Sequence, residues 1–89
     1  MMNITTSKGS TFDVNWIWGP LLGTNQIMID LADARTIKEI AQDFEGCEKI
    51  EKTDAKKSGV KEVYEGYTEL VSVIRERVSG TVRVTLEKP

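Results

Sequence analysis

The chain has 89 residues, of which 39% are hydrophobic and 29% are charged, and twelve Lys and Arg against fourteen Asp and Glu leave a net charge of −2. This composition is typical of a folded protein and excludes a disordered chain. The length predicts a single domain over residues 1–89, because two domains would each be too small to form a core. The basic residues are scattered rather than gathered in a stripe, so nucleic-acid binding is not expected.

The first third of the chain has the pattern of three strands. Residues 2–7 predict a short strand that ends in a turn at residues 8–10. Thr11–Trp18 then alternates strictly, with Phe12, Val14, Trp16 and Trp18 expected on one face. Gly19-Pro20 ends this strand because proline has no amide proton for the ladder. After a loop, Gln26–Leu31 alternates again, with its isoleucines and leucine inward.

One short helix follows. Thr36 and Glu39 have the spacing of a capping box, in which each side chain bonds the backbone amide of the other. The apolar residues that follow fall on one stripe, which would face a sheet: Ile37, Ile40, Ala41 and Phe44. Gly46 stands where a left-handed residue ends a helix. So short a helix must be stabilised by packing.

The remainder of the chain returns to strand patterns. Residues 48–54 predict a charged strand at an edge of the sheet, and residues 55–59 predict a turn. Residues 60–77 form a long β-prone stretch in which Gly66 is expected to make a bulge. Ser79-Gly80 predicts a hairpin turn. The last strand is expected to place three apolar residues inward: Val82, Val84 and Leu86.

The order of these elements, βββ-α-βββ(β), predicts an α+β fold. We expect one or more antiparallel sheets with six to seven short strands in all, arranged as a sandwich or a half-barrel, with the single short helix covering the open side.

Several kinds of chemistry lack their residues. The chain has no His, which removes His-based acid–base catalysis and most zinc sites, and a single Cys47 can form neither a disulfide nor a thiolate cluster. No enzyme activity, cofactor or metal is therefore predicted. Asp30 is expected on the outer face of its strand and Asp33 in a turn before the helix, where an anion is favoured. Cys47 is expected to be a small buried residue.

The loop after the second strand is the strongest candidate for a binding surface. Loops are usually polar, whereas residues 16–23 combine two Trp with two adjacent Leu. Two interpretations stay open: an exposed interface, or a loop that folds back to close one end of the core. The candidate interface residues are Trp16, Trp18, Pro20, Leu21 and Leu22. Around Gly66, Tyr64 and Tyr67 are expected to have a structural role.

Five patterns taken as a set carry a resemblance to a known group of proteins. They are the opening strand pair, an Asp-rich turn, and the segments IAQDFEG at residues 40–46, YEGYTEL at residues 64–70 and GTVRVTL at residues 80–86. Together they resemble small uncharacterised proteins of phages and prophages of Gram-positive gut bacteria, some sited near tail and baseplate genes. The resemblance covers most of the chain after residue 26 and consists of structural patterns. It implies a virion-associated or tail-assembly role and supplies no catalytic or binding residues.

These observations lead to two functional expectations. The first is a non-enzymatic phage structural or assembly module that acts through protein–protein contact, with itself as a homo-oligomer or with a larger phage or host protein. The alternative is a small phage-encoded inhibitor that binds a host defence protein or its nucleotide signal. No apolar run has the length of a membrane span or a signal peptide core. We therefore expect the host bacterial cytoplasm as the location, with incorporation into the virion as a further expectation.

Overall fold

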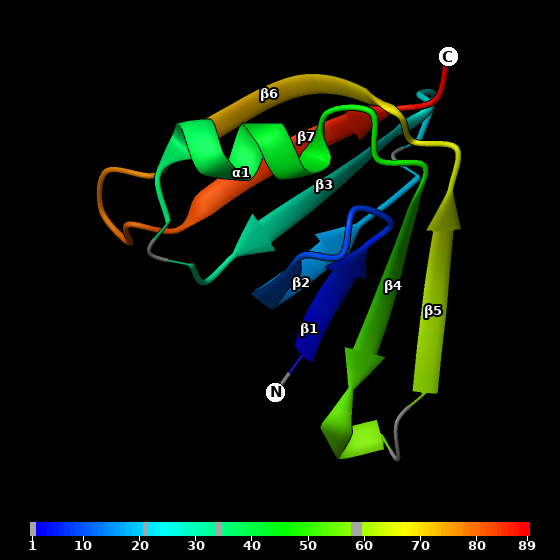
Figure 1. The fold of residues 1–89 in the computed structure, drawn as a ribbon, viewed down its shortest axis with the longest axis horizontal. Helices are drawn as coiled ribbons and strands as arrows, with labels where there is room; N and C mark the ends of the chain where they lie inside the picture. Colours follow the sequence, from blue (N-terminus) through cyan, green and yellow to red (C-terminus); the bar gives the residue numbers. More distant parts are fainter. Residues whose placement is uncertain (1, 21, 34, 58–59) are drawn as a thin grey trace.

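The computed structural model describes residues 2–20, 22–33, 35–57 and 60–89. These residues form seven strands, one α-helix and one turn of 3-10 helix (Figure 1). In chain order the elements are β1 (Met2–Thr6), β2 (Thr11–Trp18), β3 (Gln26–Leu31), α1 (Ile37–Phe44), β4 (Lys49–Asp54), η1 (Ala55–Lys57), β5 (Val60–Glu65), β6 (Glu69–Arg75) and β7 (Val82–Glu87).

The seven described strands belong to one antiparallel sheet in the order β5-β4-β1-β2-β3-β7-β6. Strands β1, β2 and β3 form a central meander. The β4–β5 hairpin joins it through β1, and the β6–β7 hairpin joins it on the other side through β7 and β3. The sheet is not closed, so β5 and β6 are its edges. The expected α+β class, with an antiparallel sheet and one short helix, is confirmed.

The hydrophobic core lies between the inner face of the sheet and α1. In Figure 1, α1 lies across β3, β6 and β7, whereas β4 and β5 run in a different direction on the other side of the molecule. The rings of Phe12 and Phe44 stack with their centroids 5.1 Å apart. The buried hydrophobic residues are Ile4, Phe12, Val14, Ile27, Ile29, Leu31, Ile40, Phe44, Cys47, Ile50, Tyr67, Val82, Val84 and Leu86. All three predicted inward residues of β7 are among them.

The helix begins and ends where the sequence predicts. The Oγ1 atom of Thr36 accepts a hydrogen bond from the backbone N–H of Glu39 at 3.2 Å, so Thr36 is the N-cap. After Phe44 the chain turns away, and Gly46 has φ +70°, a left-handed conformation that suits glycine. Ile40 and Phe44 are fully buried, and this packing on the sheet stabilises so short a helix.

The predicted single face of β2 is wrong beyond Val14. The pairing of β2 with β3 shifts register between Val14 and Trp16, so Asn15 is an inserted residue. After this bulge the alternation is reversed. Ile17 packs against the core, and Trp16 and Trp18 lie on the outer face of the sheet. The strict alternation of residue types in the sequence gives no sign of this shift.

Two predictions for the second half of the chain are also wrong. Strand β4 is not at an edge, because β1 and β5 pair with its two sides. Its charged residues are accommodated by cross-strand ion pairs, such as Lys52 Nζ to Glu62 Oε2 at 3.4 Å. Gly66 is not a bulge within one long strand. It has φ +83° and lies in the bend that separates β5 from β6. Of the turn predicted at residues 55–59, residues 58 and 59 lie outside the described part.

Among the described residues, no helix has the length and apolar character needed to span a membrane.

Candidate functional site

The outer face of β2, β3 and β7 carries a cluster of aromatic and polar side chains. Cross-strand pairing places Trp16 beside Asp30, and Asp30 beside Arg83. In the next row of the sheet, Trp18 pairs with Met28. We call these five residues, Trp16, Trp18, Met28, Asp30 and Arg83, the tryptophan face. Their grouping results from the bulge at Asn15, which turns both indoles out of the core.

The two indoles form the exposed part of the tryptophan face. Trp18 is 65% exposed and Trp16 is half-buried. Their ring centroids are 5.8 Å apart and their planes are inclined by 48°. A shallow hollow of about 360 Å³ is lined by Trp16 and Trp18. Two tilted rings beside a hollow can receive an apolar side chain from another molecule.

Arg83 is positioned by two neighbours, Trp16 and Glu76. Its guanidinium carbon lies 5.2 Å from the centroid of the Trp16 ring, within the range of a cation–π interaction. Its Nη1 lies 3.3 Å from Glu76 Oε1. Its side chain remains 38% exposed, so a carboxylate or carbonyl of another molecule can reach the guanidinium. Arg83 therefore combines an aromatic contact with a free hydrogen-bonding capacity at the surface.

Asp30 is the buried centre of the tryptophan face. It is only 5% exposed, although it lies on the outer side of its strand as predicted. Its Oδ2 accepts a hydrogen bond from Asn15 Nδ2 at 2.9 Å, and its Oδ1 accepts one from Thr81 Oγ1 at 3.2 Å. The bulge residue is thus bonded to a buried carboxylate. This bond fixes the bulge and, with it, the outward direction of the two indoles.

The predicted interface residues do not all lie together. Trp16 and Trp18 form the tryptophan face, whereas Pro20 lines a separate hollow with Tyr64, Tyr67 and other residues near β5. Pro20 is exposed and Leu22 is fully exposed, so neither closes the core. Leu21 lies outside the described residues.

The prediction from the sequence missed Met28, Asp30 and Arg83 as neighbours of the tryptophans. The signal for Arg83 was present, because the alternation of the last strand places it outward. The pairing of that strand with β3, which brings it near Trp16, joins residues far apart in the chain and was not visible.

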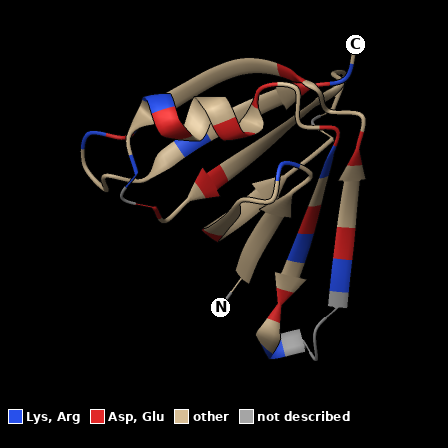
Figure 2. Ribbon diagram, in the orientation of Figure 1, with Lys and Arg blue, Asp and Glu red and all other residues tan. Residues whose placement is uncertain are grey.

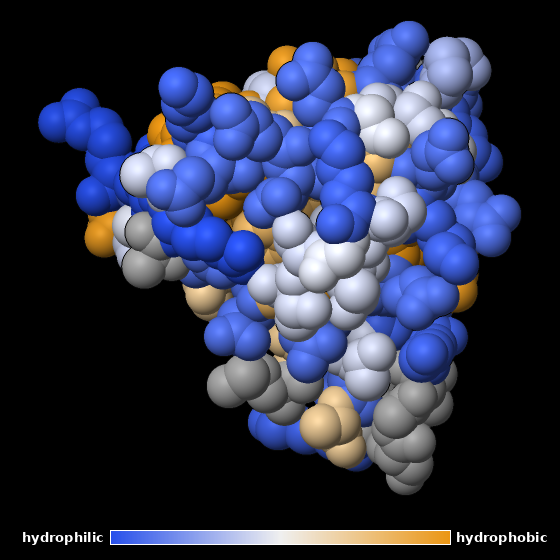
Figure 3. All heavy atoms as spheres, viewed as in Figure 1, coloured by the Kyte–Doolittle hydropathy of each residue, from blue (hydrophilic) through white to orange (hydrophobic). Residues whose placement is uncertain are grey.

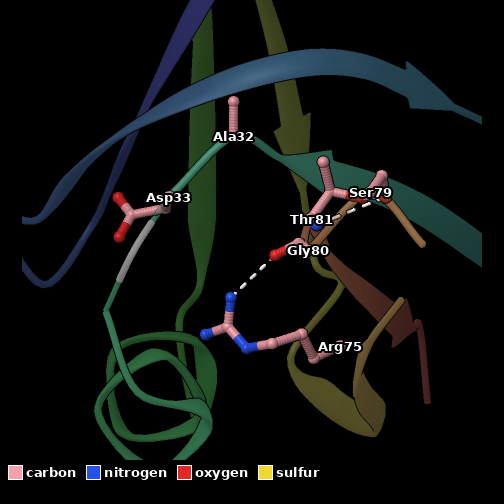
Figure 4. A pocket seen from close by; sticks show the side chains of 6 residues that line it. All are labelled: Ala32, Asp33, Arg75, Ser79, Gly80 and Thr81. Carbon is pink, nitrogen blue, oxygen red and sulfur yellow. Dashed lines mark hydrogen bonds between the residues drawn. The ribbon is translucent and has the colours of Figure 1, made fainter. Parts of the chain in front are cut away.

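A second hollow of about 480 Å³ lies beside the β6–β7 turn (Figure 4). Its lining residues are Ala32, Asp33, Arg75, Ser79, Gly80 and Thr81. Arg75 donates from Nη1 to the Gly80 carbonyl at 2.7 Å and from Nη2 to the Arg35 carbonyl at 2.5 Å. The charged groups of this hollow are bonded to neighbouring parts of the fold. We therefore assign it to the framework that holds the entry of α1.

Asp33 is held in the same framework by Arg35. The carboxylate accepts hydrogen bonds from Arg35 Nε at 2.9 Å and from Arg35 Nη2 at 2.7 Å. These bonds hold the pKa of Asp33 below its ordinary value. Arg35 also covers the Phe12 ring at 3.9 Å and donates to the Thr11 carbonyl at 2.7 Å. The structural role expected for Asp33 agrees with these contacts.

The outer face of β1, β4 and β5 differs from the tryptophan face. Figure 2 shows alternating acidic and basic bands along β4 and β5. Glu51 contacts Lys49 at 3.3 Å and Lys61 at 3.7 Å. The side of the molecule on which α1 lies, shown in Figure 3, is also largely hydrophilic, with hydrophobic residues in small separate groups. This half of the sheet presents ion pairs to water.

Tyr64 and Cys47 have structural environments. Burial and a hydrogen bond from Tyr64 Oη to Glu62 Oε2, 3.0 Å long, raise the pKa of Tyr64 to about 12. Cys47 is buried, and its Sγ donates to the Lys49 carbonyl at 3.2 Å. In the described part of the chain, no group of three or more His, Cys, Asp or Glu residues could hold a metal ion.

Comparisons of this chain with protein-family models, with curated proteins and with solved structures find no match.

Proposed function

We propose that this chain is a non-enzymatic binding domain that attaches to a larger protein through its tryptophan face. The observation that carries this proposal is the position of Trp16 and Trp18. The domain has few large side chains for its own core, yet both tryptophans lie outside that core. Asp30 bonds the bulge residue Asn15 that precedes them, and Arg83 contacts the Trp16 ring.

The energetics of binding favour such a surface. Covering an exposed apolar side chain contributes about 25 cal/mol for each Å² removed from water, and Trp and Arg are the residues most often found at binding hot spots. Trp16 and Trp18 are held by the sheet and by the bond between Asn15 and Asp30. Because Trp16 is half-buried and contacts Arg83, its side chain loses less conformational entropy than a freely exposed one when a partner covers it.

The chemistry of the tryptophan face indicates the kind of partner. The hollow between the indoles fits an apolar side chain, and the guanidinium of Arg83 fits a carboxylate or a backbone carbonyl beside it. We propose a protein surface that supplies both groups. The resemblance to phage proteins encoded near tail and baseplate genes supports an assembly role, in which the partner is a structural protein of the virion.

The test compares Trp18→Ser with a matched change of another exposed hydrophobic residue, Val78→Ser in the β6–β7 turn. Each purified form is immobilised and exposed to a lysate of phage-producing bacteria, and the captured protein is identified and purified. Its affinity is then measured by calorimetry. We expect Trp18→Ser to weaken binding at least about ten-fold, as for loss of a hot-spot residue, and Val78→Ser to leave it unchanged.

The stability of Trp18→Ser is the control for this experiment. Because Trp18 is 65% exposed, its replacement should change the free energy of unfolding by less than about 1 kcal/mol. Equal binding by Trp18→Ser and the original chain would contradict the proposal. Capture of a host defence protein in place of a virion protein would favour the inhibitor role instead.

A further inference from the structure

Strand β5 presents a free edge at one end of the sheet. Among the described strands it pairs with β4 alone. In Figure 1 it forms the margin of the ribbon, with no described segment drawn beyond it. The backbone N–H and C=O groups on this side are available to another strand, and natural proteins usually cover or guard such groups.

The outward side chains of β5 have a self-complementary order. Cross-strand pairing with β4 places Lys61, Val63 and Glu65 on the outer face of the sheet. Lys61 has a side chain that is 63% exposed, Val63 is 48% exposed and Glu65 is also exposed. A basic, an apolar and an acidic residue thus follow one another at alternate positions. If this row is reversed and set beside itself, each charge faces its opposite.

We infer that β5 binds the β5 of a second copy of this chain, as an antiparallel pair with its two-fold axis at Val63. In this register Val63 contacts Val63 of the partner subunit. Lys61 faces Glu65 of the partner subunit, and the same ion pair is repeated on the other side of the axis. On the inner face, Tyr64 comes opposite Glu62 of the partner subunit. The two seven-stranded sheets become one continuous sheet.

Charge selects this register over its neighbours. A shift of the axis by one residue to Glu62 would place that carboxylate directly against Glu62 of the partner subunit. Like charges in directly opposed positions destabilise a strand pair. The shift would also oppose Lys61 to an apolar residue in place of an acid. The Val63-centred pairing avoids this contact between like charges and gives Lys61 an acidic partner, so it is favoured over the Glu62-centred one.

The other edge of the sheet is less suited to the same contact. The pairing of β6 with β7 shifts register between Leu70 and Ser72, which marks a bulge in the edge strand. Bulges twist an edge away from a regular partner. The pairing of β5 with β4 has no such shift. The contact between copies is therefore assigned to β5.

This contact is separate from the tryptophan face. Strand β5 is at one end of the sheet, and β2, β3 and β7 lie beyond β4 and β1. The proposed contact uses none of the five residues of the tryptophan face. Two linked binding surfaces raise the overall affinity for a partner with repeated sites, without any new contact to that partner.

Reversing the charges of β5 tests the inference. The dimer dissociation constant of each variant is measured by sedimentation velocity over a range of protein concentrations. The single variants Lys61→Glu and Glu65→Lys each turn two attractive pairs into two repulsive ones. Each should raise the dimer dissociation constant about ten-fold. The double variant Lys61→Glu/Glu65→Lys restores opposite charges and should return the constant to within about three-fold of the original. Lys38→Glu on α1, the same charge change at another exposed lysine, should have no effect.

Circular dichroism of each variant is the control for correct folding. A chain that stays monomeric at millimolar concentration would overturn the inference. So would a dimer that withstands both single reversals, or a double variant as weak as the singles. A dimer abolished by Trp18→Ser and unaffected by the β5 variants would overturn it too, because the contact would then lie on the tryptophan face. Failure of partner binding alone would leave the dimer intact, so this test is distinct from that of the proposed function.

Discussion

The outer surface of this one sheet has two halves of opposite character, although both halves cover the same core. On β2, β3 and β7 the outer side chains include two tryptophans and a buried carboxylate. On β1, β4 and β5 they are mainly Thr, Asn, Lys and Glu, joined by ion pairs at the surface. The inner faces differ as well: β3 and β7 bury several apolar residues there, whereas β4 buries Ile50 beside the ion pair of Lys52 with Glu62. The outer faces therefore differ in exposed aromatic area and in the density of ion pairs.

Two acidic residues show how different these halves are. Asp30 is almost completely buried and accepts two hydrogen bonds from within the fold. Glu51 keeps a partly exposed side chain and forms ion pairs with two lysines. A buried carboxylate is retained only where its hydrogen bonds are made, whereas a surface ion pair contributes little to stability. Asp30 therefore holds neighbouring residues in place, whereas Glu51 forms part of a water-exposed surface.

The largest predicted effect concerns two glycines on either side of β2, Gly9 before it and Gly19 after it. Gly19 has φ +144°, and a Cβ there would lie 2.5 Å from Ile27 Cγ2 and 2.9 Å from Ile27 Cα. We expect Gly19→Ala to lower the free energy of unfolding by about 3 kcal/mol, through backbone strain and this overlap. Gly9→Ala, at φ +89° with open space around it, should cost about 1 kcal/mol. Urea denaturation measures both losses of stability. Equal losses would argue against the close contact with Ile27 as the cause of the larger effect at Gly19.

The next prediction compares the two carboxylates directly. Asp30→Ala should lower the free energy of unfolding by about 2 to 3 kcal/mol, because Asn15 and Thr81 lose a charged acceptor in a buried place. Glu51→Ala should change it by less than about 1 kcal/mol. Urea denaturation again provides the measurement. If both substitutions cost the same, Asp30 would not be the fixed centre of the tryptophan face.

The smallest predicted effect concerns the framework that both halves share at the entry of α1. Hydrogen bonds from Arg35 lower the pKa of Asp33 from its ordinary 3.8. The Asp33 carboxylate therefore binds a proton less readily in the folded state than in the unfolded state. The stability that this difference gives to the fold is present above pH 3.8. That stability is lost as the pH falls through 3.8 toward the lowered pKa.

Unfolding measured between pH 2 and pH 6 should show a steeper acid loss in the original chain than in Asp33→Asn. Arg35→Gln should show the same reduced slope, because it removes the cause of the shift. An identical slope in all three proteins would argue against a role for this pair in acid stability.

Local patterns predicted most of the elements correctly. Strands β2 and β3 have the predicted bounds, and the cap at Thr36 was recognised because its geometry depends on three neighbouring residues. The position of β4 was predicted wrongly because its many charged residues are typical of a strand at the edge of a sheet. Which strands flank it depends on pairings with β1 and β5, and the one with β1 is distant in the chain.

The candidate site was predicted only in part, for the same reason. The two tryptophans were singled out by their residue types, yet their direction was predicted wrongly. The bulge at Asn15 depends on a bond to Asp30 in the next strand. The contact of Trp16 with Arg83 depends on a strand near the other end of the chain. A pattern of residues along one strand contains neither fact.

The order of strands also bears on how the chain folds. Most neighbours in the sheet are neighbours in sequence, so their hairpins can form within microseconds. Two joints are different, since β1 pairs with β4 and β3 pairs with β7 across long stretches of chain. Closing such loops costs entropy before the core is complete. We expect these two joints, on either side of the central meander, to set the rate of folding.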